Sequence, residues 1–243
     1  MKIVSWNIAC IPKKYNLFGD PTLRINDIIL SILEENADII CLQEVFCKKS
    51  RKTCENIFKE KGYNYIMSEE ANWGINGGLV LATKYKILHH EENVFRDFCG
   101  EDRFAKKGFL FTILKNKDKL VSCINTHMNA DPIIPVAKNS NLTRIDQFDS
   151  IINKIKKETK HTDSMINVFC GDINTDYDTH PLVHFLNQLS QSYRVQINKT
   201  KLKTYFEEQL DYIIFYAKQL NVPTYKRKMS ILSDHSMMIC NYA

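Results

Sequence analysis

The chain has 243 residues, a mass of 28.4 kDa and a formal net charge of +5. Hydrophobic residues make up 44% and charged residues 25%, a balance that excludes a disordered chain and predicts one large globular domain over residues 1–243. No apolar stretch approaches the roughly 20 residues that span a bilayer, and the small positive charge favours an anionic partner without choosing between nucleic acid and phospholipid.

The first half of the chain alternates strand and helix patterns. An apolar run over 3–7 predicts a first strand, and Asp20 followed by Pro21 is typical of a helix start. Isoleucines then recur at helical spacing until the chain turns at Asn36 into a strand predicted over 38–42. A second helix is predicted over 52–61, where Gly62 ends it. Further strands are predicted over 63–67, 78–83, 109–115 and 120–125.

The second half continues in the same way. Apolar residues at helical spacing predict a third helix over 142–155, ahead of a strand over 166–170. A shorter helix over 181–189 and strands over 210–216 and 237–242 complete the chain. Hairpins interrupt the alternation of strands and helices, so we expect an α/β fold with mixed rather than purely parallel sheets.

Eight cysteines are spread along the chain without the C-x-x-C spacing of zinc sites. Several fall inside apolar runs, which favours buried reduced thiols, with disulfides as the alternative. The first strand pattern begins at residue 3, and no secretory signal precedes it. We therefore expect a cytoplasmic protein, or a secreted one if a leader has been removed.

Acidic, amide and imidazole side chains stand at the ends of apolar runs throughout the chain. Because strand ends gather at one edge of a sheet, such residues can form a catalytic cleft from distant parts of the sequence. These polar positions are Asn7, Glu44, His127, Asp172, Asn174, Asp211, Asp234 and His235.

Two of these carboxylates lie in apolar runs, where an unpaired charge is costly. Glu44 is a candidate metal ligand with Asn7 beside it, because oxygen ligands of this kind suit Mg²⁺ or Mn²⁺. The alternative for Glu44 is an ordinary strand-end acid in a salt bridge. Asp211 needs a partner, and a histidine is a natural one.

The remaining positions each have a structural alternative. Asp172 and Asn174 lie on the same side of an extended segment, where they suit a phosphoryl group and its attacking water, but both residue types also favour turns. Asp234 and His235 follow a serine, as in a helix cap with a surface histidine. His127 follows a strand and could equally be a satisfied core residue.

The whole set, in this order, resembles the endonuclease/exonuclease/phosphatase superfamily, which has the fold of pancreatic deoxyribonuclease I. The resemblance covers essentially the whole chain, and no member of the set is missing. It implies a four-layer α/β sandwich, in which two packed mixed β-sheets are flanked by helices. It also implies a working enzyme rather than a binding module without catalytic activity.

The resemblance carries a metal site over to three of these positions. Asn7 and Glu44 would hold the metal, and Asp234 would lie in or beside the same shell. The implied cofactor is Mg²⁺, with Mn²⁺ or Co²⁺ as substitutes.

The resemblance also carries over the acid–base groups. His235 would be the general base, held in its tautomer by Asp211. Asp172 and Asn174 would orient the nucleophile and contact the phosphate. His127 would contact the phosphate or help the leaving oxygen depart.

Within the superfamily, the chain looks most like the neutral sphingomyelinases. Residues 42–46 are followed by a basic helix, and residues 99–108 resemble that family's cysteine-glycine stretch before a lysine-glycine strand start. Residues 125–131, with Arg144 and Gln147 on the next helix, resemble its threonine-histidine segment.

Two departures leave the lipid specificity open. Met128-Asn129 stands where that family commonly has Leu-Gln, and the stretch before Asp211 is short. The implied reaction is of the phospholipase C type, which cleaves sphingomyelin or a related choline phospholipid into phosphocholine and a lipid alcohol. The alternative is a DNA or RNA endonuclease or exonuclease with the same catalytic set. An inositol-phosphate phosphatase fits less well, because residues 210–212 lack the tryptophan-cysteine-aspartate-arginine pattern of that branch.

A phospholipid hydrolase must contact a membrane surface. Trp73, Ile75, Ile133 and Ile134 lie in loops and could insert at the interface, although loops packed on their own domain are the alternative. The basic run over 48–52 suits a solvated helix start better than an anion site. We expect a monomer without an obligate protein partner.

Overall fold

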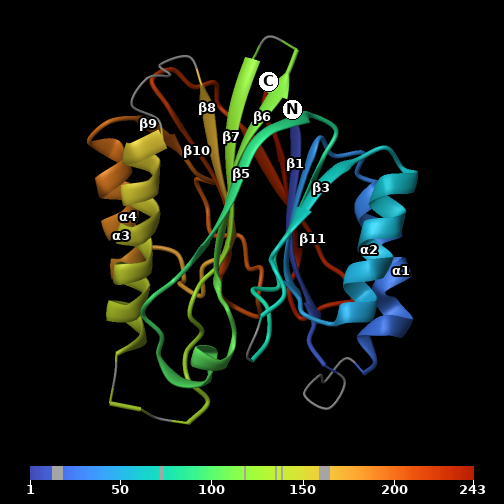
Figure 1. The fold of residues 1–243 in the computed structure, drawn as a ribbon. Coiled ribbons are helices and arrows are strands. Elements are labelled where there is room, and N and C mark those ends of the chain that lie inside the picture. The colour runs from blue at the N-terminus through green and yellow to red at the C-terminus, as the bar shows by residue number, and fades with distance from the viewer. Residues whose placement is uncertain (13–18, 72–73, 118, 135, 138, 159–164) are drawn as a thin grey trace.

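The computed structural model describes residues 1–12, 19–71, 74–117, 119–134, 136–137, 139–158 and 165–243. Two six-stranded mixed sheets pack face to face (Figure 1). The first sheet has the order β11 (Thr224–Lys228), β12 (Met237–Asn241), β1 (Lys2–Cys10), β2 (Ile39–Val45), β4 (Val80–Thr83) and β3 (Asn64–Met67). The second has the order β5 (Lys86–Val94), β6 (Gly108–Asn116), β7 (Lys119–His127), β8 (Ile166–Asp172), β10 (Asp211–Ala217) and β9 (Arg194–Gln196).

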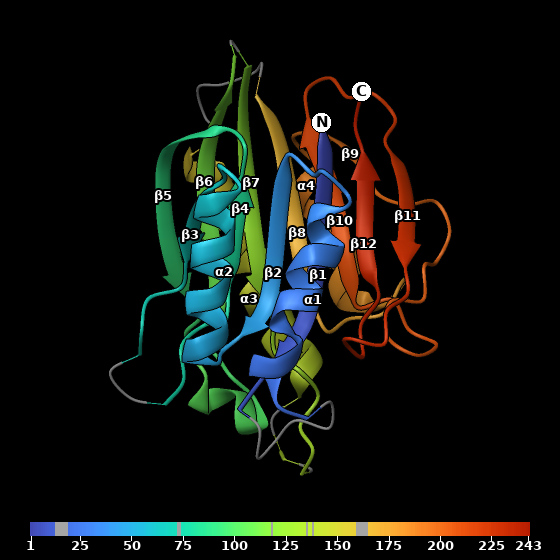
Figure 2. The ribbon, with the colours of Figure 1, turned by 90° about the vertical axis from the view of Figure 1, so that its right-hand side faces the viewer.

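Helices cover both outer faces of this pair of sheets. Helices α1 (Pro21–Leu33) and α2 (Lys48–Glu60) lie over the first sheet, as Figure 2 shows, and α3 (Ser140–Glu158) and α4 (His180–Ser190) lie over the second. A short 3₁₀ helix, η2 (Gly100–Phe104), precedes β6. The expected four-layer α/β sandwich is therefore confirmed. None of the described helices is long and apolar enough to cross a bilayer.

The chain connects strands and helices in the same order in both sheets. In each, one central pair is parallel and is joined by a helix that crosses its outer face, as β1–α1–β2 and β7–α3–β8. Each unit continues through a second helix to an edge strand and then to the strand beside the pair, as α2–β3–β4 and α4–β9–β10. The parallel strands β1, β2, β7 and β8 all end away from the two chain termini, at the lower end in Figure 1.

The core forms three apolar layers, one between the sheets and one beneath each helix pair. Strand alternation sorts the side chains, since Ile40 and Leu42 of β2 face α1 and α2 while Ile39 and Cys41 face the second sheet. The layer under α3 and α4 is aromatic, with Phe148 stacked on a phenylalanine of α4 at a ring distance of 4.5 Å. Seven of the eight cysteines are buried as free thiols, as expected for cysteines in apolar runs.

A buried amide joins the sheets within the middle layer. Asn125 of β7 donates to the carbonyl oxygens of Leu42 in β2, at 3.1 Å, and Val80 in β4, at 2.9 Å. Its own side-chain oxygen accepts from Gln43 at 2.7 Å. Both amide side chains are fully buried, so these hydrogen bonds satisfy polar groups that have no access to water.

The predicted elements are confirmed, apart from shifts at their ends. Asp20 caps α1 by accepting from the Thr22 backbone N–H at 2.9 Å. Helix α2 starts at Lys48 rather than at residue 52, because its first turn buries two polar residues that carry no apolar signal. One of them, Arg51, donates to Asn76 and to the carbonyl oxygen of Ser68, so the basic run is not wholly solvated.

Three strands have no counterpart among the predictions, namely β5, β9 and β11. All three are edge strands, paired on one side. Strand β5 has the sequence KILHHEENV and is largely exposed. Edge strands tolerate charged residues because one side meets solvent, so their sequences lack the alternation that identifies a half-buried strand.

We predict that Asn125→Leu lowers the free energy of unfolding by about 3 kcal/mol, because it removes three buried hydrogen bonds that contribute about 1 kcal/mol each. Urea unfolding followed by circular dichroism measures this change. The matched control is Asn153→Leu at an exposed position of α3, which should stay within about 0.5 kcal/mol of wild type. Equal stability of the two variants would contradict a structural role for the amide bridge.

Candidate active site

The second sheet supplies three of the predicted residues from neighbouring strands. His127 and Asp172 are the last residues of the parallel strands β7 and β8 and are partners in their register. Asp211 begins β10, which runs antiparallel to β8, and it pairs with Asp172. Because one strand starts where its neighbours end, all three residues lie at the same edge of the sheet.

The first sheet supplies another four at its corresponding edge. Asn7 and Glu44 lie near the ends of the parallel strands β1 and β2. Asp234 and His235 directly precede β12, which runs antiparallel to β1. The Trp6 indole donates to the His235 carbonyl oxygen at 2.8 Å, which holds the segment before β12 against β1.

The backbone departs from regular strand geometry at this edge. The register of β1 and β2 shifts between Asn7 and Cys10, where Ala9 has φ +47°, and Glu44 has φ +60°. Bulges of this kind re-aim side chains next to functional sites, and a left-handed glutamate costs of the order of 1 kcal/mol. Gly171 of β8 passes so close to β7 that a Cβ would lie 2.1 Å from the Thr126 carbonyl oxygen.

The two edges together form one cleft with a volume of about 600 Å³. Six of the predicted residues line it, and Asn7 and Asp211 stand behind it in contact with lining residues. The lining residues are Glu44, His127, Ala130, Asp131, Ser140, Asn141, Arg144, Asp172, Asn174, Thr175, Asp176, Thr179, Tyr205, Glu208, Leu210, Asp234 and His235.

Asp172 lies at the centre of the polar contacts. One of its oxygens accepts from the Asn7 side chain at 2.9 Å, and the other accepts from the Asn174 backbone N–H at 2.9 Å. The Nε2 atoms of His127 and His235 lie 3.7 and 3.8 Å from the first oxygen, too far for hydrogen bonds. Burial raises the pKa of Asp172 to about 7, although the charge of His235 and both hydrogen bonds oppose that shift.

His235 and Asp211 form a buried pair. The Nδ1 atom of His235 lies 2.7 Å from an Asp211 carboxylate oxygen, and Asp211 is fully buried. Burial by itself favours the neutral ring, but the charges of Asp211 and Asp172 outweigh it and raise the pKa of His235 to about 10. The pair fixes which ring nitrogen carries a proton toward Asp211, so Nε2 is the atom that faces the cleft.

His127 is held as a neutral ring on the other side of the cleft. Burial, followed by the positive charges of Lys107 and His235, holds the pKa of His127 well below its usual range. Its Nε2 atom lies 3.8 Å from Glu44 and 3.7 Å from Asp172. His127 therefore lies between the metal ligand predicted on the first sheet and the acid at the end of β8.

Hard oxygen donors gather around Glu44. Burial raises the pKa of Glu44, while a hydrogen bond from Asn7 and the charge of Lys107 oppose the shift. A divalent cation would favour the ionised carboxylate in this half-buried place, so Glu44 and the neighbouring Asp234 fit a cation such as Mg²⁺. Asn7 donates to Asp172 and accepts from the Ala9 backbone N–H at 3.1 Å, so its role as a direct ligand stays a prediction.

A second group of potential ligands lies beside the first. Ligand atoms of Asp172, Asp211 and His235 all lie within 4.8 Å of one another. Two of the three are already joined by the short Nδ1–carboxylate contact, an arrangement typical of a proton-transferring histidine. We therefore favour the Glu44 side for the cation.

Comparison with known proteins places the chain in a family. Residues 4–235 match the family described as Endonuclease/Exonuclease/phosphatase. The chain belongs to this family. Among curated relatives, sphingomyelinase C 2 of Leptospira interrogans is 26% identical over 78% of the chain, and phospholipase C of Staphylococcus aureus is 25% identical over 78%. The chain spans 33% and 62% of the lengths of these two relatives.

Other relatives show how widely the family ranges. The exoribonuclease subunit Ccr4 of Candida albicans is 24% identical over 73% of the chain, which spans 27% of that protein. Beta toxin of Staphylococcus aureus shares the fold with a TM-score of 0.85 over 100% of both chains, at 20% identity. A beta-toxin mutant whose structure holds magnesium ions has a TM-score of 0.81 at 21% identity, over 100% of this chain and 99% of that one. The family and its relatives support a phosphoric diester hydrolase.

Two residues at the candidate site, Lys107 and Tyr205, were not predicted from the sequence. Lys107 is 3% exposed and donates to Asp102 at 2.8 Å and to the Met128 carbonyl oxygen at 3.1 Å. The Tyr205 ring lies 4.8 Å from the His235 ring and lines the cleft. A lysine directly before the glycine that opens a buried strand is a usable signal for the first, whereas Tyr205 lies in a loop without a pattern.

The loop that follows His127 is held by buried polar groups. The side-chain oxygen of Asn129 accepts from the Cys99 backbone N–H at 2.8 Å, and its own backbone N–H donates to Gln147 at 3.0 Å. Arg144 donates to the Asn129 carbonyl oxygen at 3.1 Å. Arg144 and Gln147 of α3 thus fix the backbone directly after His127.

The residues predicted to contact a membrane fall into three groups. Trp73 lies outside the described residues. Ile75 is 37% exposed and pairs with the backbone near Ala105 rather than lining the cleft. Ile133 and Ile134 are 89% and 68% exposed in the loop after β7, so these two do not pack on their own domain.

We predict that Asp211→Asn lowers the pKa of His235, measured in chelator by NMR of histidine-labelled protein. In wild type the ring should titrate near pH 10, because the Asp211 and Asp172 charges stabilise its protonated form against burial. Asp234→Asn is the control and should shift the pKa less, because Asp234 is the smallest of these influences. A His235 titration that does not respond to Asp211→Asn would show that the buried pair does not set the charge of the ring.

Proposed function

We propose that the chain is a Mg²⁺-dependent phosphodiesterase of the phospholipase C type, with a choline phospholipid such as sphingomyelin as its substrate. The observation that carries this proposal is the charge of the cleft. Among the described residues that line it, six are acidic and Arg144 is the one permanent cation. An acidic cleft attracts a cationic headgroup and repels the polyanionic backbone of a nucleic acid.

Exposed apolar side chains beside the cleft support a lipid surface as the partner. Ile133 lies two residues after the lining residue Asp131 and is 89% exposed. Phe206 follows the lining residue Tyr205 and is 77% exposed, and Ile231 precedes Asp234 by three residues and is 94% exposed. Three separate loops thus carry an apolar side chain beside the cleft, where shallow insertion into a lipid surface would bring the headgroup to the site.

The chain's own residues account for proton transfer. The Nε2 atom of His235 takes a proton from water while Asp211 holds Nδ1, and the water oxygen forms a bond to phosphorus. Asp172 and Asn174 orient the water and the phosphate. The bond between phosphorus and the lipid oxygen breaks, and that oxygen takes a proton from solvent while His235 returns its proton to solvent. His127, as a neutral ring, contacts the phosphate or helps the leaving oxygen depart by donating a hydrogen bond. The products are phosphocholine and a lipid alcohol.

The cation would have two electrostatic effects in this scheme. Held by Glu44 and Asp234, with Asn7 beside them, it would polarise a phosphoryl oxygen and stabilise the charge that develops in the transition state. Its charge would also oppose the carboxylates that raise the pKa of His235, which would move that pKa toward the range of a general base.

We predict that the purified protein releases phosphocholine from sphingomyelin vesicles in Mg²⁺, and that chelation abolishes the release. Plasmid DNA offered under the same conditions should stay intact, because the acidic cleft repels its phosphates. Phosphocholine assay and gel electrophoresis measure the two reactions side by side. Plasmid nicking without phosphocholine release would overturn the lipid assignment and support a nuclease.

His235→Ala provides the matched control for this experiment. It should lower turnover at least about 10²-fold, the usual contribution of a general base, and leave the chain folded, with a lower melting temperature because Asp211 loses its buried partner. Near-normal turnover in this variant would remove His235 from the proposed mechanism.

We predict that the double variant Ile133→Ser with Ile134→Ser lowers hydrolysis of sphingomyelin vesicles by about tenfold or more, since each buried isoleucine contributes about 1.5–3 kcal/mol to membrane contact. Hydrolysis of a water-soluble choline phosphodiester should be unchanged. Val222→Ser is the control, because this residue is 66% exposed in the loop between β10 and β11. Equal losses on both substrates would show that the pair acts on the site and not on the surface.

A further inference from the structure

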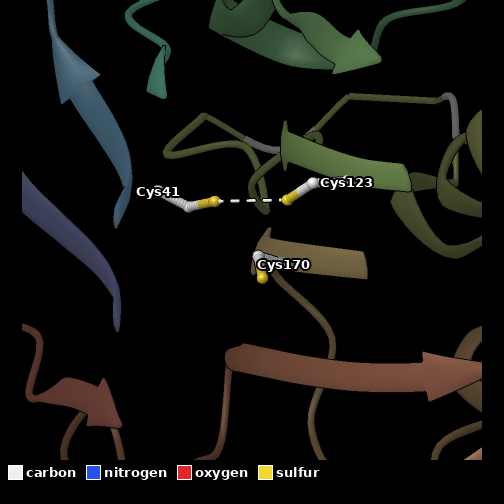
Figure 3. Close-up of side chains that lie close together, drawn as sticks. All are labelled: Cys41, Cys123 and Cys170. Atoms are coloured by element: carbon white, nitrogen blue, oxygen red, sulfur yellow. Dashed lines mark hydrogen bonds between the residues drawn. The ribbon is translucent and has the colours of Figure 1, made fainter. Parts of the chain in front are cut away.

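Three cysteine side chains that do not line the cleft meet between the two sheets. Cys41 lies on β2 of the first sheet, and Cys123 and Cys170 lie on the neighbouring strands β7 and β8 of the second. Figure 3 shows Cys41 reaching across the layer toward the other two. All three residues are fully buried, and their sulfur atoms lie within 4.8 Å of one another.

The separation of the Cys41 and Cys123 sulfur atoms suits two ligands of one cation as well as an ordinary thiol–thiol contact, and it is too long for a disulfide. Zinc–thiolate bonds of about 2.3 Å place two sulfur ligands of one cation about 3.8–4.0 Å apart. The sulfur atoms of Cys41 and Cys123 lie 3.8 Å apart. A disulfide bond of about 2.05 Å would require these atoms to approach by almost half of that separation, against the packing of two sheets.

We propose that Cys41, Cys123 and Cys170 form a binding site for one thiophilic divalent cation, with Zn²⁺ as the abundant candidate. Three thiolates bind the cation, and the three thiol protons pass to solvent. The resulting centre carries a net charge of −1, so the cation neutralises most of the charge that three thiolates would place in the surrounding layer of aliphatic side chains such as Ile39, Leu81 and Val168.

Sulfur ligands separate this site from the oxygen ligands of the cleft. Thiolates select zinc and softer cations, whereas carboxylates and amides select Mg²⁺. The proposal therefore stands apart from the phosphodiesterase reaction and does not depend on it.

A cation in this place would tie the sheets together close to the cleft. Cys41 precedes Glu44 by three residues on β2, and Cys170 precedes Asp172 by two on β8. Cys123 lies four residues before His127 on β7. One bound cation would thus connect three of the strands whose ends carry the site, and ligand binding to the folded chain alone raises its stability.

The experiment supplies the metal while the chain folds, because the three side chains are buried in the folded protein. Wild type is produced in cells grown with added Zn²⁺ or Cd²⁺, purified in Mg²⁺ under reducing conditions, and passed through gel filtration. Mass spectrometry of metal content should find about one cation per chain. The cadmium form should show the ultraviolet charge-transfer band of thiolate ligands and a higher melting temperature than protein produced without the metal.

Matched variants locate the cation. Cys123→Ala and the closer-sized Cys123→Val should lose both the metal and the band, and Cys54→Ala should keep them, since Cys54 is a buried thiol of another layer. Glu44→Gln should also keep them, which separates this site from the cleft.

Two results would overturn the proposal. One is wild-type protein that retains no Zn²⁺ or Cd²⁺ after gel filtration. The other is a folded Cys123 variant, with native circular dichroism, that retains as much metal as wild type.

Discussion

The catalytic arrangement depends on how the two sheets are held against each other, and the Asn125 amide is one of the directional contacts that fix this, beside the Asn7–Asp172 and His235–Asp211 pairs. The first sheet carries Glu44 and His235, and the second carries His127 and Asp172. Apolar packing between sheets is non-directional, so by itself it tolerates small slides of one sheet over the other. The Asn125 hydrogen bonds to β2 and β4 are directional, and they lie two residues from the end of β7. They set the separation and register of the two halves just above the cleft.

The charges of the cleft work against its folding. Burial raises the pKa of both Glu44 and Asp172, which means that their ionised forms are less stable here than in water. His235 and Lys107 offset part of this cost from within the chain. The left-handed backbone at Glu44 adds strain in the same place. Buried charge and backbone strain both destabilise the folded chain at this site. A bound cation and a bound substrate would offset these costs.

The sequence was sufficient to predict the fold and to mark candidate site residues where the signal is local. Strand-end polar residues such as Glu44 and Asp172 stand out because they interrupt apolar runs, and the structure brings them to one cleft. The sequence was not sufficient where burial depends on the neighbouring element. Arg51 is buried by a hydrogen-bonded loop, and Asn125 by the facing sheet, yet both are polar residues without a periodic pattern. The edge strand β5 was missed because solvent on one side removes the need for apolar alternation.

For the cysteines, too, the sequence predicts burial but not which residues meet. Their contact arises from the layered fold. Apolar runs predict that Cys41 and Cys123 are buried, but their meeting across 82 residues depends on the stacking of two sheets. That stacking creates two chemically different places within a few residues of each other along the same strands. The cleft at the ends of the strands is open to water and offers oxygen ligands, which suit Mg²⁺ because this ion keeps part of its water shell. The apolar layer between the two sheets offers sulfur ligands, which suit a cation that loses its bound water. Hydration and ligand type would therefore keep the two cations apart without any barrier between the sites.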